Sequence, residues 1–119
     1  MKNFNKQTGN IGEAFVYDFL KKKNFTILQT NYKNKIGEID IIAMQNNVIV
    51  FVEVKTRSSF KFGLPREAIN YYKQKKIVNT AACYLKQKGL YDKCLVRFDC
   101  IEIYDPNNNP HIEHIENIF

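Results

Sequence analysis

The spacing of hydrophobic residues predicts a chain that alternates helices and strands. In residues 10–23 apolar side chains recur every three or four positions, which predicts an amphipathic helix. Residues 25–31 predict a short strand. Residues 66–88 repeat the helical spacing over a longer stretch, with lysines on the other face and Gly89 after the last turn. Residues 95–104 predict a last strand, and a short polar tail follows it.

The central part of the chain predicts a β-hairpin. Residues 38–44 and 48–55 are rich in β-branched side chains and are separated by a short Gln-Asn-Asn segment. Apolar residues occupy both faces of these strands near the turn, which indicates a sheet that is covered on two sides. Residues 56–65 predict a basic and aromatic loop before the second helix. We therefore expect one α/β domain spanning residues 1–119, with the order α-β-β-β-α-β.

The hairpin register places polar side chains together. If the hairpin closes through the two-residue Asn-Asn turn at 46–47, Asp40 lies opposite Glu53. In the same register, Glu38 lies opposite Lys55. Cross-strand partners share a face of the sheet, so these four side chains are predicted to converge at the end of the hairpin away from its turn. A shift of one residue in the register would scatter them.

The repulsion between two carboxylates that face each other across the hairpin must be offset. Two of them repel by roughly 1 kcal/mol at 4 Å in water and by about 4 kcal/mol at an effective dielectric of 20. Either one carboxylate keeps its proton, or a cation lies between them. Oxygen ligands without cysteine or histidine favour Mg²⁺ or Mn²⁺ over zinc. Glu13 is a third candidate acid, because it borders the buried stripe of the first helix. It either reaches inward to a metal or lies at the helix edge in a structural role.

Charge and cysteine content narrow the class of protein. Eighteen Lys and Arg residues against twelve Asp and Glu give a formal charge of +6, which favours polyanionic partners, although a solvated lysine surface explains the same number. Three cysteines without paired spacing fit reduced thiols rather than a disulfide framework or a zinc knuckle. The sequence has neither a signal-peptide pattern nor an apolar stretch of membrane-spanning length. We therefore expect a cytoplasmic protein without a membrane partner.

Five motifs along the chain together resemble the YraN-like family of small bacterial proteins. They cover nearly the whole sequence, and they are GEA at 12–14, GEIDII at 37–42, FVEVKTR at 51–57, G-x-P-x-x-A at 63–68 and RFD at 97–99. Through Asp40 and the E-x-K of Glu53 and Lys55, that family resembles the PD-(D/E)XK nucleases and, among them, the Holliday junction resolvases. The resemblance implies a restriction-endonuclease-like core, in which helices flank a mixed central sheet and an antiparallel hairpin carries the acids.

The resemblance also implies roles for residues. Asp40, Glu53 and the backbone carbonyl of Val54 would bind Mg²⁺ or Mn²⁺. Lys55 would orient or activate the attacking water, and Glu13 would complete the site directly or through water. The implied function is metal-dependent endonuclease activity on branched or otherwise structured DNA, with a homodimer expected by analogy with resolvases. A catalytically silent nucleic-acid-binding module is the alternative, and an assembly protein is a third reading.

Basic and aromatic residues near these acids are candidates for contacts with DNA. Those predicted to bind phosphates are Lys33, Lys35, Arg57, Lys61, Arg66, Lys73 and Lys76. Those predicted to stack on bases are Tyr32, Phe60 and Phe62. For each of them a solvated surface position is the alternative.

Other polar residues are given structural roles. The spacing of His111 and His114 resembles that of a metal-binding pair, but we expect both to lie in a polar tail outside the core. Arg97 and Asp99 share a face of the last strand and are predicted to form a structural ion pair, while the resemblance leaves a role in substrate binding open. Glu38 has no assigned role.

Overall fold

The fold consists of helices packed on a twisted sheet. The computed structural model describes residues 6–57, 71–105 and 109–119, with side chains from residue 13 to residue 56 in the first range. The elements in chain order are α1 (Lys6–Lys22), β1 (Thr26–Lys33), β2 (Glu38–Gln45), β3 (Val48–Arg57), α2 (Tyr71–Gln87), β4 (Leu95–Tyr104) and β5 (His111–Ile115). No helix in the described ranges is long and apolar enough to cross a membrane.

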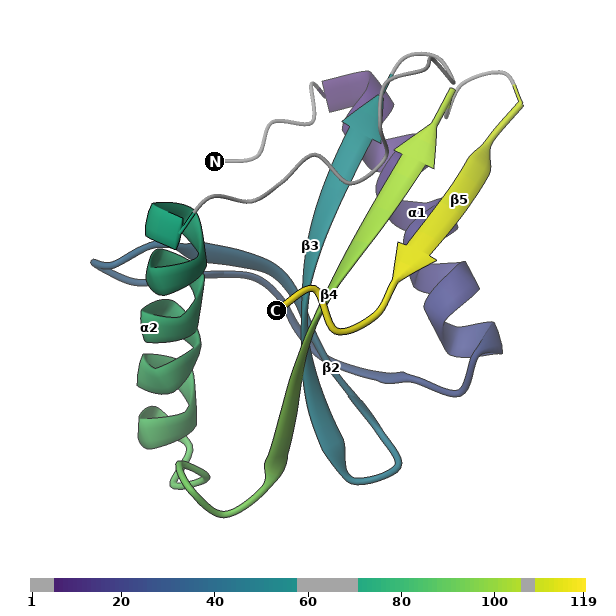
Figure 1. The fold of residues 1–119 in the computed structure, drawn as a ribbon. Helices are drawn as coiled ribbons and strands as arrows, with labels where there is room; N and C mark the ends of the chain where they lie inside the picture. Colours follow the sequence, from purple (N-terminus) through teal and green to yellow (C-terminus); the bar gives the residue numbers. More distant parts are fainter. Residues whose placement is uncertain (1–5, 58–70, 106–108) are drawn as a thin grey trace.

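The sheet is mixed, as predicted. Its strand order is β1-β2-β3-β4-β5, with β3 and β4 parallel and every other neighbouring pair antiparallel. A parallel pair needs a crossover connection, and α2 lies in the segment that joins β3 to β4. Figure 1 shows α1 and α2 on opposite sides of the sheet. The α/β class and the predicted order of elements as far as β4 are confirmed.

The turn of the β2-β3 hairpin has the predicted geometry. Asn46 and Asn47 have φ values of 50° and 65°, the left-handed conformation that both central residues of a type I′ turn require. The strands pair in the predicted register, from Gln45 opposite Val48 to Ile41 opposite Val52. The prediction from the Asn-Asn turn is therefore confirmed over this part of the hairpin.

Hydrophobic side chains cover both faces of the sheet. On one face, Val16 and Leu20 of α1 pack with Ile41, Val52 and other buried residues of the strands. On the opposite face, a second cluster packs under α2, and its members are Tyr32, Ile39, Ile42, Ile49, Phe51, Ala81, Tyr84 and Leu85. The central strands are therefore buried on two sides, which confirms the prediction from their continuous apolar pattern.

The predicted polar tail is a fifth strand, and that prediction was wrong. Residues His111–Ile115 pair antiparallel with β4 along Cys100 to Tyr104. The short HIEHI segment is polar and follows a Pro- and Asn-rich stretch, so its pattern resembles that of a loop. Pairing with an otherwise open edge of the sheet satisfies its backbone groups, and this tertiary effect outweighs the weak local preference.

Candidate functional site

Asp40 lies where the β2-β3 hairpin opens. The β2-β3 pairing runs from the turn to Ile41 opposite Val52. One residue further along β2, the Oδ2 atom of Asp40 accepts a hydrogen bond from the backbone N–H of Val54, at 2.7 Å. A side-chain oxygen thus takes the place of a backbone acceptor at this point of the ladder. Asp40 consequently occupies a fork between the two strands.

The strand changes face at the same point. Ile41 belongs to the core under α1, whereas Ile39 belongs to the core under α2. Residues two positions apart share a face in a regular strand, so β2 is irregular at Asp40. The neighbouring strand β1 pairs with β2 on either side of this point, and its residue Asn31 has a φ of 51°, a left-handed conformation that asparagine tolerates. The irregularity directs Asp40 away from the face that a regular hairpin would give it.

A small cavity brings Asp40 together with Glu13. The cavity encloses ≈ 220 Å³ including its open mouth, and its lining residues are Glu13, Val16, Tyr17, Asn31, Asp40, Ile41 and Val54. Glu13 is half-buried on α1 and lines this cavity. Two acids that are 27 positions apart thus border the same space, because α1 packs across the fork.

Both acids affect the pKa of the Tyr17 hydroxyl. Burial raises the pKa of Tyr17 above its usual value of 10.0, and the negative charges of Glu13 and Asp40 raise it further, while a hydrogen bond with Thr30 opposes the rise. Tyr17 therefore keeps its proton at neutral pH. Sequence reasoning missed this residue, although Tyr17 follows Glu13 by four positions and so lies on the same face of the helix.

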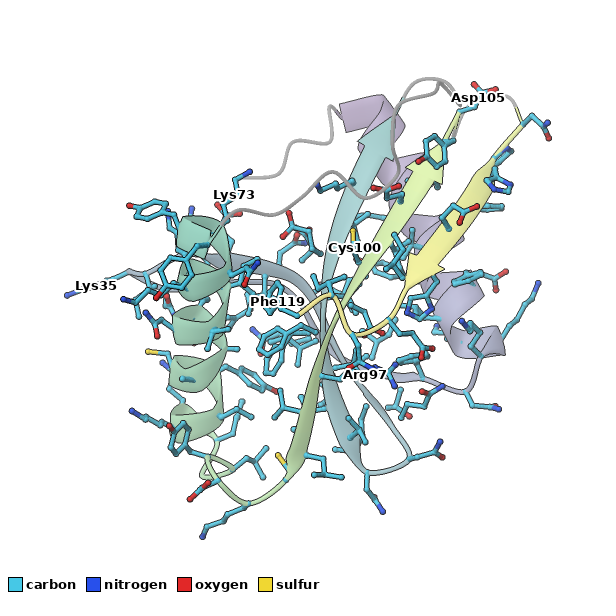
Figure 2. All side chains as sticks on the ribbon, in the orientation of Figure 1. Lys35, Lys73, Arg97, Cys100, Asp105 and Phe119 are labelled. Atoms are coloured by element: carbon cyan, nitrogen blue, oxygen red, sulfur yellow. The ribbon has the colours of Figure 1, made fainter. Side chains whose placement is uncertain are left out.

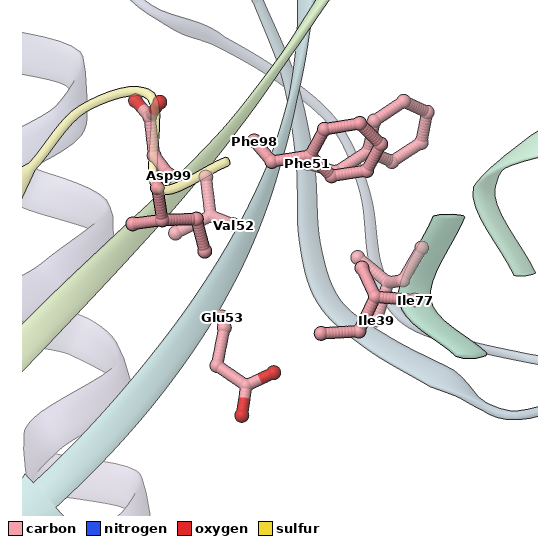
Figure 3. Close-up of a pocket in the computed structure, with 8 residues that line it drawn as sticks. Ile39, Phe51, Val52, Glu53, Ile77, Phe98 and Asp99 are labelled. Carbon is pink, nitrogen blue, oxygen red and sulfur yellow. The ribbon is translucent and has the colours of Figure 1, made fainter. Parts of the chain in front are cut away.

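Glu53 lies on the other side of β3. Val52 and Val54 belong to the core under α1, so Glu53 between them points toward α2, and Lys55 shares that face. Glu53 lines a second cavity of ≈ 220 Å³ including its mouth, together with Ile39, Phe51, Val52, Ile77, Phe98, Asp99 and Ile118. Figure 3 shows Glu53 on the side of the strand that faces Ile39 and Ile77. The two acids therefore border different cavities, and the predicted pairing of Asp40 opposite Glu53 is not among the paired positions of the hairpin.

Glu38 is held in the β1-β2 ladder. It lies opposite Lys33 at the end of the two strands, on the far side of Asp40 from the hairpin turn. The predicted pairing of Glu38 with Lys55 is not among the paired positions of β2 and β3, because that ladder ends at Ile41. The fork therefore separates Glu38 from β3.

The donor set around the first cavity suits a hard cation. Carboxylates of Glu13 and Asp40, the amide of Asn31 and the hydroxyl of Tyr17 all offer oxygen, and neither cysteine nor histidine lines this space. In the described ranges no group of three or more acidic, histidine or cysteine residues is close enough to hold a metal. Mg²⁺ commonly binds proteins through one or two carboxylates and completes its shell with water and substrate phosphates. Two carboxylates at the cavity are therefore compatible with that ion.

The predicted phosphate-binding residues have different positions. Lys33, Lys35, Lys73 and Lys76 are exposed, and Figure 2 shows Lys35 and Lys73 on the same side of the molecule. The side chain of Arg57 and all of Lys61, Arg66, Phe60 and Phe62 lie outside the described residues. Tyr32 is buried at 6% exposure, so the prediction that it stacks on bases was wrong. Its ring packs on Tyr84, and its hydroxyl donates to Gln87 Oε1 at 2.9 Å.

Arg97 and Asp99 form the predicted ion pair. Arg97 Nε donates to Asp99 Oδ1 and Nη2 donates to Oδ2, each at 2.9 Å. Asp99 is fully buried, and the backbone N–H of Asn117 donates to its Oδ1 at 3.1 Å. Burial raises the pKa of Asp99, but hydrogen bonds from His114, Arg97 and Asn117 outweigh it and hold the pKa below its usual value of 3.8. The pair links the C-terminal segment to β4 through the contacts of Asp99 with His114 and Asn117.

His114 belongs to this network rather than to a metal pair. Its side chain is 3% exposed, and its Nε2 lies 2.8 Å from Asp99 Oδ2. The Nζ atom of Lys23 lies 2.8 Å from Nδ1, so the lysine donates to Nδ1 and Nε2–H donates to Asp99. His111 instead contacts Glu113, at 3.1 Å. The two histidines bind different partners, and the expectation that both lie outside the core was wrong for His114.

A second buried carboxylate lies on the opposite face of β4. Glu102 is 1% exposed, and the hydroxyl of Tyr104 donates to its Oε1 at 2.7 Å. In the parallel β3-β4 register, Glu102 is the partner of Lys55. Sequence reasoning did not single out Glu102, because a single acid in an apolar strand gives no indication of its burial.

Known proteins resemble the chain along its full length. Residues 12–103 match the family described as "Uncharacterised protein family UPF0102". A UPF0102 protein of Caldanaerobacter subterraneus subsp. tengcongensis is 47% identical over 126 residues, covering 100% of both chains. UPF0102 proteins of two Clostridium botulinum strains, Alaska E43 and 657, are 42% and 45% identical and cover 100% and 97% of this chain and 98% and 95% of their own. These matches confirm the predicted YraN-like relationship.

Proposed function

Starting from the fact that the chain belongs to the UPF0102 family, we propose that it is a divalent-metal-dependent endonuclease acting on branched or otherwise structured DNA. One observation carries the proposal: Glu13 of α1 and Asp40 of β2 line the same cavity at the fork of the hairpin. Two acids beside a protonated tyrosine form a negative, partly enclosed site that opens to solvent. Such a site favours a hard cation, and the basic chain favours a polyanionic substrate.

The metal proposed for this site is Mg²⁺ or Mn²⁺. Asp40 and Glu13 would hold it at the cavity, with the backbone carbonyl of Val54 contributing from β3, as the resemblance to PD-(D/E)XK nucleases implies. The resemblance also implies Glu53 as a ligand, but Glu53 borders the other cavity, so we leave it out of this site. A bound divalent ion would polarise the phosphoryl oxygens, neutralise developing negative charge and lower the pKa of a bound water. The oxygen donors of the cavity fit such an ion, and three or more protein carboxylates are not required for it.

Residues beside the proposed metal orient the ligands and donate hydrogen bonds to the substrate. The hydrogen bond from Val54 N–H fixes one oxygen of Asp40, so the other oxygen is oriented before any ligand binds. Tyr17 stays protonated and can donate to a phosphate oxygen at the cavity mouth. The resemblance gives Lys55 the role of orienting the attacking water, and Lys55 lies on the face of β3 that it shares with Glu53. Hydrolysis places the hydroxyl of that water on phosphorus, breaks the bond to the leaving oxygen and delivers the proton to that oxygen.

The substrate class follows from charge and from the resemblance. The exposed lysines of the β1-β2 turn and of α2 offer positive charge beside the sheet, and phosphate contacts of this kind supply most of the affinity for DNA. Branched DNA is the substrate that the resemblance to resolvases implies. A homodimer would present two sites to such a junction, and we include it in the proposal.

A nuclease assay with matched variants tests the proposal. Linear, nicked and four-way DNA are incubated with the protein in Mg²⁺, in Mn²⁺ and in EDTA. Metal-dependent cutting should be lost in Asp40→Asn and Lys55→Ala and strongly reduced in Glu13→Gln. Asp18→Asn is the control, because that acid lies exposed on α1 in an ion pair with Lys22. Cutting that persists in Asp40→Asn would refute the proposal.

A binding module that does not cleave is the second candidate. The observation that favours it is that, within the part of the chain that the structure describes, no three metal-binding side chains are gathered. In that case the parent binds four-way DNA in a salt-sensitive manner, no metal induces cutting, and Asp40→Asn leaves the affinity unchanged or increases it. The same assay, run with a gel-shift measurement, separates the two functions.

A further inference from the structure

The helix α2 contains no acidic residue, and the first acid after it is Asp92. Between positions 71 and 91 the sequence has five lysines and no Asp or Glu, against a formal net charge of +6 for the whole chain. All five are exposed, and they are Lys73, Lys75, Lys76, Lys86 and Lys88. Positive charge is thus concentrated on one helix, on the side of the sheet opposite α1. A polyanion would be attracted to this side of the molecule.

Two aromatic rings stand among these lysines. Tyr71 and Tyr72 are each 74% exposed, whereas the buried residues of α2 are Thr80, Ala81, Tyr84 and Leu85. On a helix, Tyr71 and Tyr72 therefore lie on the side away from the sheet. The Nζ atom of Lys75 is 5.9 Å from the centroid of the Tyr71 ring. Adjacent exposed rings with flanking cations form a surface on which flat groups can stack while their phosphates meet ammonium groups.

The β1-β2 turn extends the basic surface and is fixed to α2. Asn34 Oδ1 accepts hydrogen bonds from the backbone N–H groups of Ile36 and Gly37, at 2.8 and 3.1 Å, which closes the turn. A Cβ atom on Gly37 would lie 2.9 Å from Thr80 Oγ1 and 3.6 Å from Lys76 Cε, so the turn packs directly against the helix. Lys35 in this turn is exposed. The turn therefore adds its charge to that of α2 in a fixed arrangement.

We infer that this tyrosine-lysine surface, formed by Tyr71, Tyr72, Lys73, Lys75, Lys76 and Lys35, binds a single-stranded segment of nucleic acid. The inference deepens the proposed function, on which its choice of a nucleic-acid partner rests. Unpaired bases expose their faces and can stack on the two tyrosines, whereas the bases of a duplex are stacked on each other. The surface would thus select DNA in which strands have separated, such as the arms of a junction or a flap.

A binding measurement in EDTA tests the inference without any cutting. The probes are an oligo(dT) of twelve nucleotides, a DNA hairpin with the same number of phosphates, and phosphatidylglycerol vesicles. Affinity is measured by fluorescence anisotropy of labelled DNA probes and by co-sedimentation with the vesicles, because the variants remove two of the seven tyrosines of the chain. The parent should bind oligo(dT) more tightly than the hairpin. The double variant Tyr71→Ala, Tyr72→Ala should weaken oligo(dT) binding roughly 5-fold or more, and Tyr71→Phe, Tyr72→Phe should restore it because the rings remain.

The contribution of the lysines to oligo(dT) binding is tested separately. Lys75→Gln should reduce the salt dependence of oligo(dT) binding by roughly 0.7 in the slope of log K against log salt, and Lys21→Gln on α1 should leave it unchanged. Unchanged oligo(dT) affinity in the double alanine variant would overturn the inference. So would equal losses for hairpin and oligo(dT), or losses confined to vesicle binding. Oligo(dT) binding that depends on both tyrosines, in a protein that cuts no DNA in any metal, supports the inference and refutes only the endonuclease proposal.

Discussion

The backbone N–H of Val54 is bound by the side chain of Asp40, at 2.7 Å from Oδ2, rather than by a backbone carbonyl of β2. This bond lets the two strands separate without leaving the buried N–H of Val54 unsatisfied. It also fixes the orientation of an acid at the cavity mouth. One contact therefore has two consequences, a local break in the sheet and an oriented carboxylate.

Variants of Asp40 separate these two consequences. Asp40→Asn keeps an oxygen that can accept from Val54, so the free energy of unfolding without metal should change little. Asp40→Ala removes the acceptor and should cost about 1–3 kcal/mol. In the parent, Mg²⁺ at about 100 times its Kd should add about 2.7 kcal/mol to stability, and both variants should lose this gain. Thermal denaturation with and without MgCl₂ measures both effects. Undiminished stabilisation of Asp40→Asn by Mg²⁺ would contradict the assignment.

Tyr17 reports on the charge of the cavity. Because burial and the charges of Glu13 and Asp40 raise its pKa, replacing Glu13 by glutamine should bring the Tyr17 pKa down toward 10.0. A bound divalent cation should lower the pKa in the same direction by offsetting the negative charge. Titration of ¹³C-labelled tyrosine by NMR follows the ring, with Tyr17→Phe identifying its signal. A Tyr17 pKa that does not respond to Glu13→Gln would place the acid away from the hydroxyl.

The hairpin and the first helix could be predicted from local chemistry. Two asparagines that tolerate positive φ set the turn, and the turn sets the register as far as Ile41. Helical spacing predicted that Glu13 borders the buried stripe of α1, and it left both an inward and a structural placement open. The two acids that line the cavity were both among the candidates, Asp40 because of the hairpin register and Glu13 because of helical spacing.

The face on which Asp40 lies could not be predicted in this way. It depends on a hydrogen bond to another strand and on the left-handed conformation of Asn31 in β1. Neither feature produces a repeating pattern of hydrophobic and polar residues in the sequence. Likewise, the burial of His114 depends on Asp99 and Lys23, which come from other elements of the fold. Contacts between distant segments decided both cases, whereas strand alternation for Asp40 and the polar composition of the tail for His114 predicted something else.

Asp99 makes the protein sensitive to acid. Its pKa is lower in the folded state than its usual value of 3.8, so its contribution is present above that value and is lost as the pH falls toward the folded pKa. Asp99→Asn removes the acid from a buried ion pair and should cost about 3–5 kcal/mol at pH 7. The difference from the parent should shrink below about pH 3.8, which urea denaturation at several pH values measures. Asp18→Asn is the matched control, because exposed pairs contribute little. An equal difference at pH 7 and at pH 3 would contradict this role.

Gly37 is the position at which the β1-β2 turn meets α2. A Cβ there would lie 2.9 Å from Thr80 Oγ1, and that hydroxyl is buried and donates to the carbonyl of Lys76 at 2.8 Å, so it cannot easily move. Gly37→Ala should therefore cost about 1–3 kcal/mol and push the turn away from the helix. Thr80→Ala removes the clashing atom, so the double variant should be more stable than the sum of the single losses predicts. Urea denaturation of the four proteins measures this coupling. Strictly additive losses would show that the two positions do not touch, and Lys35 would then not be held beside α2.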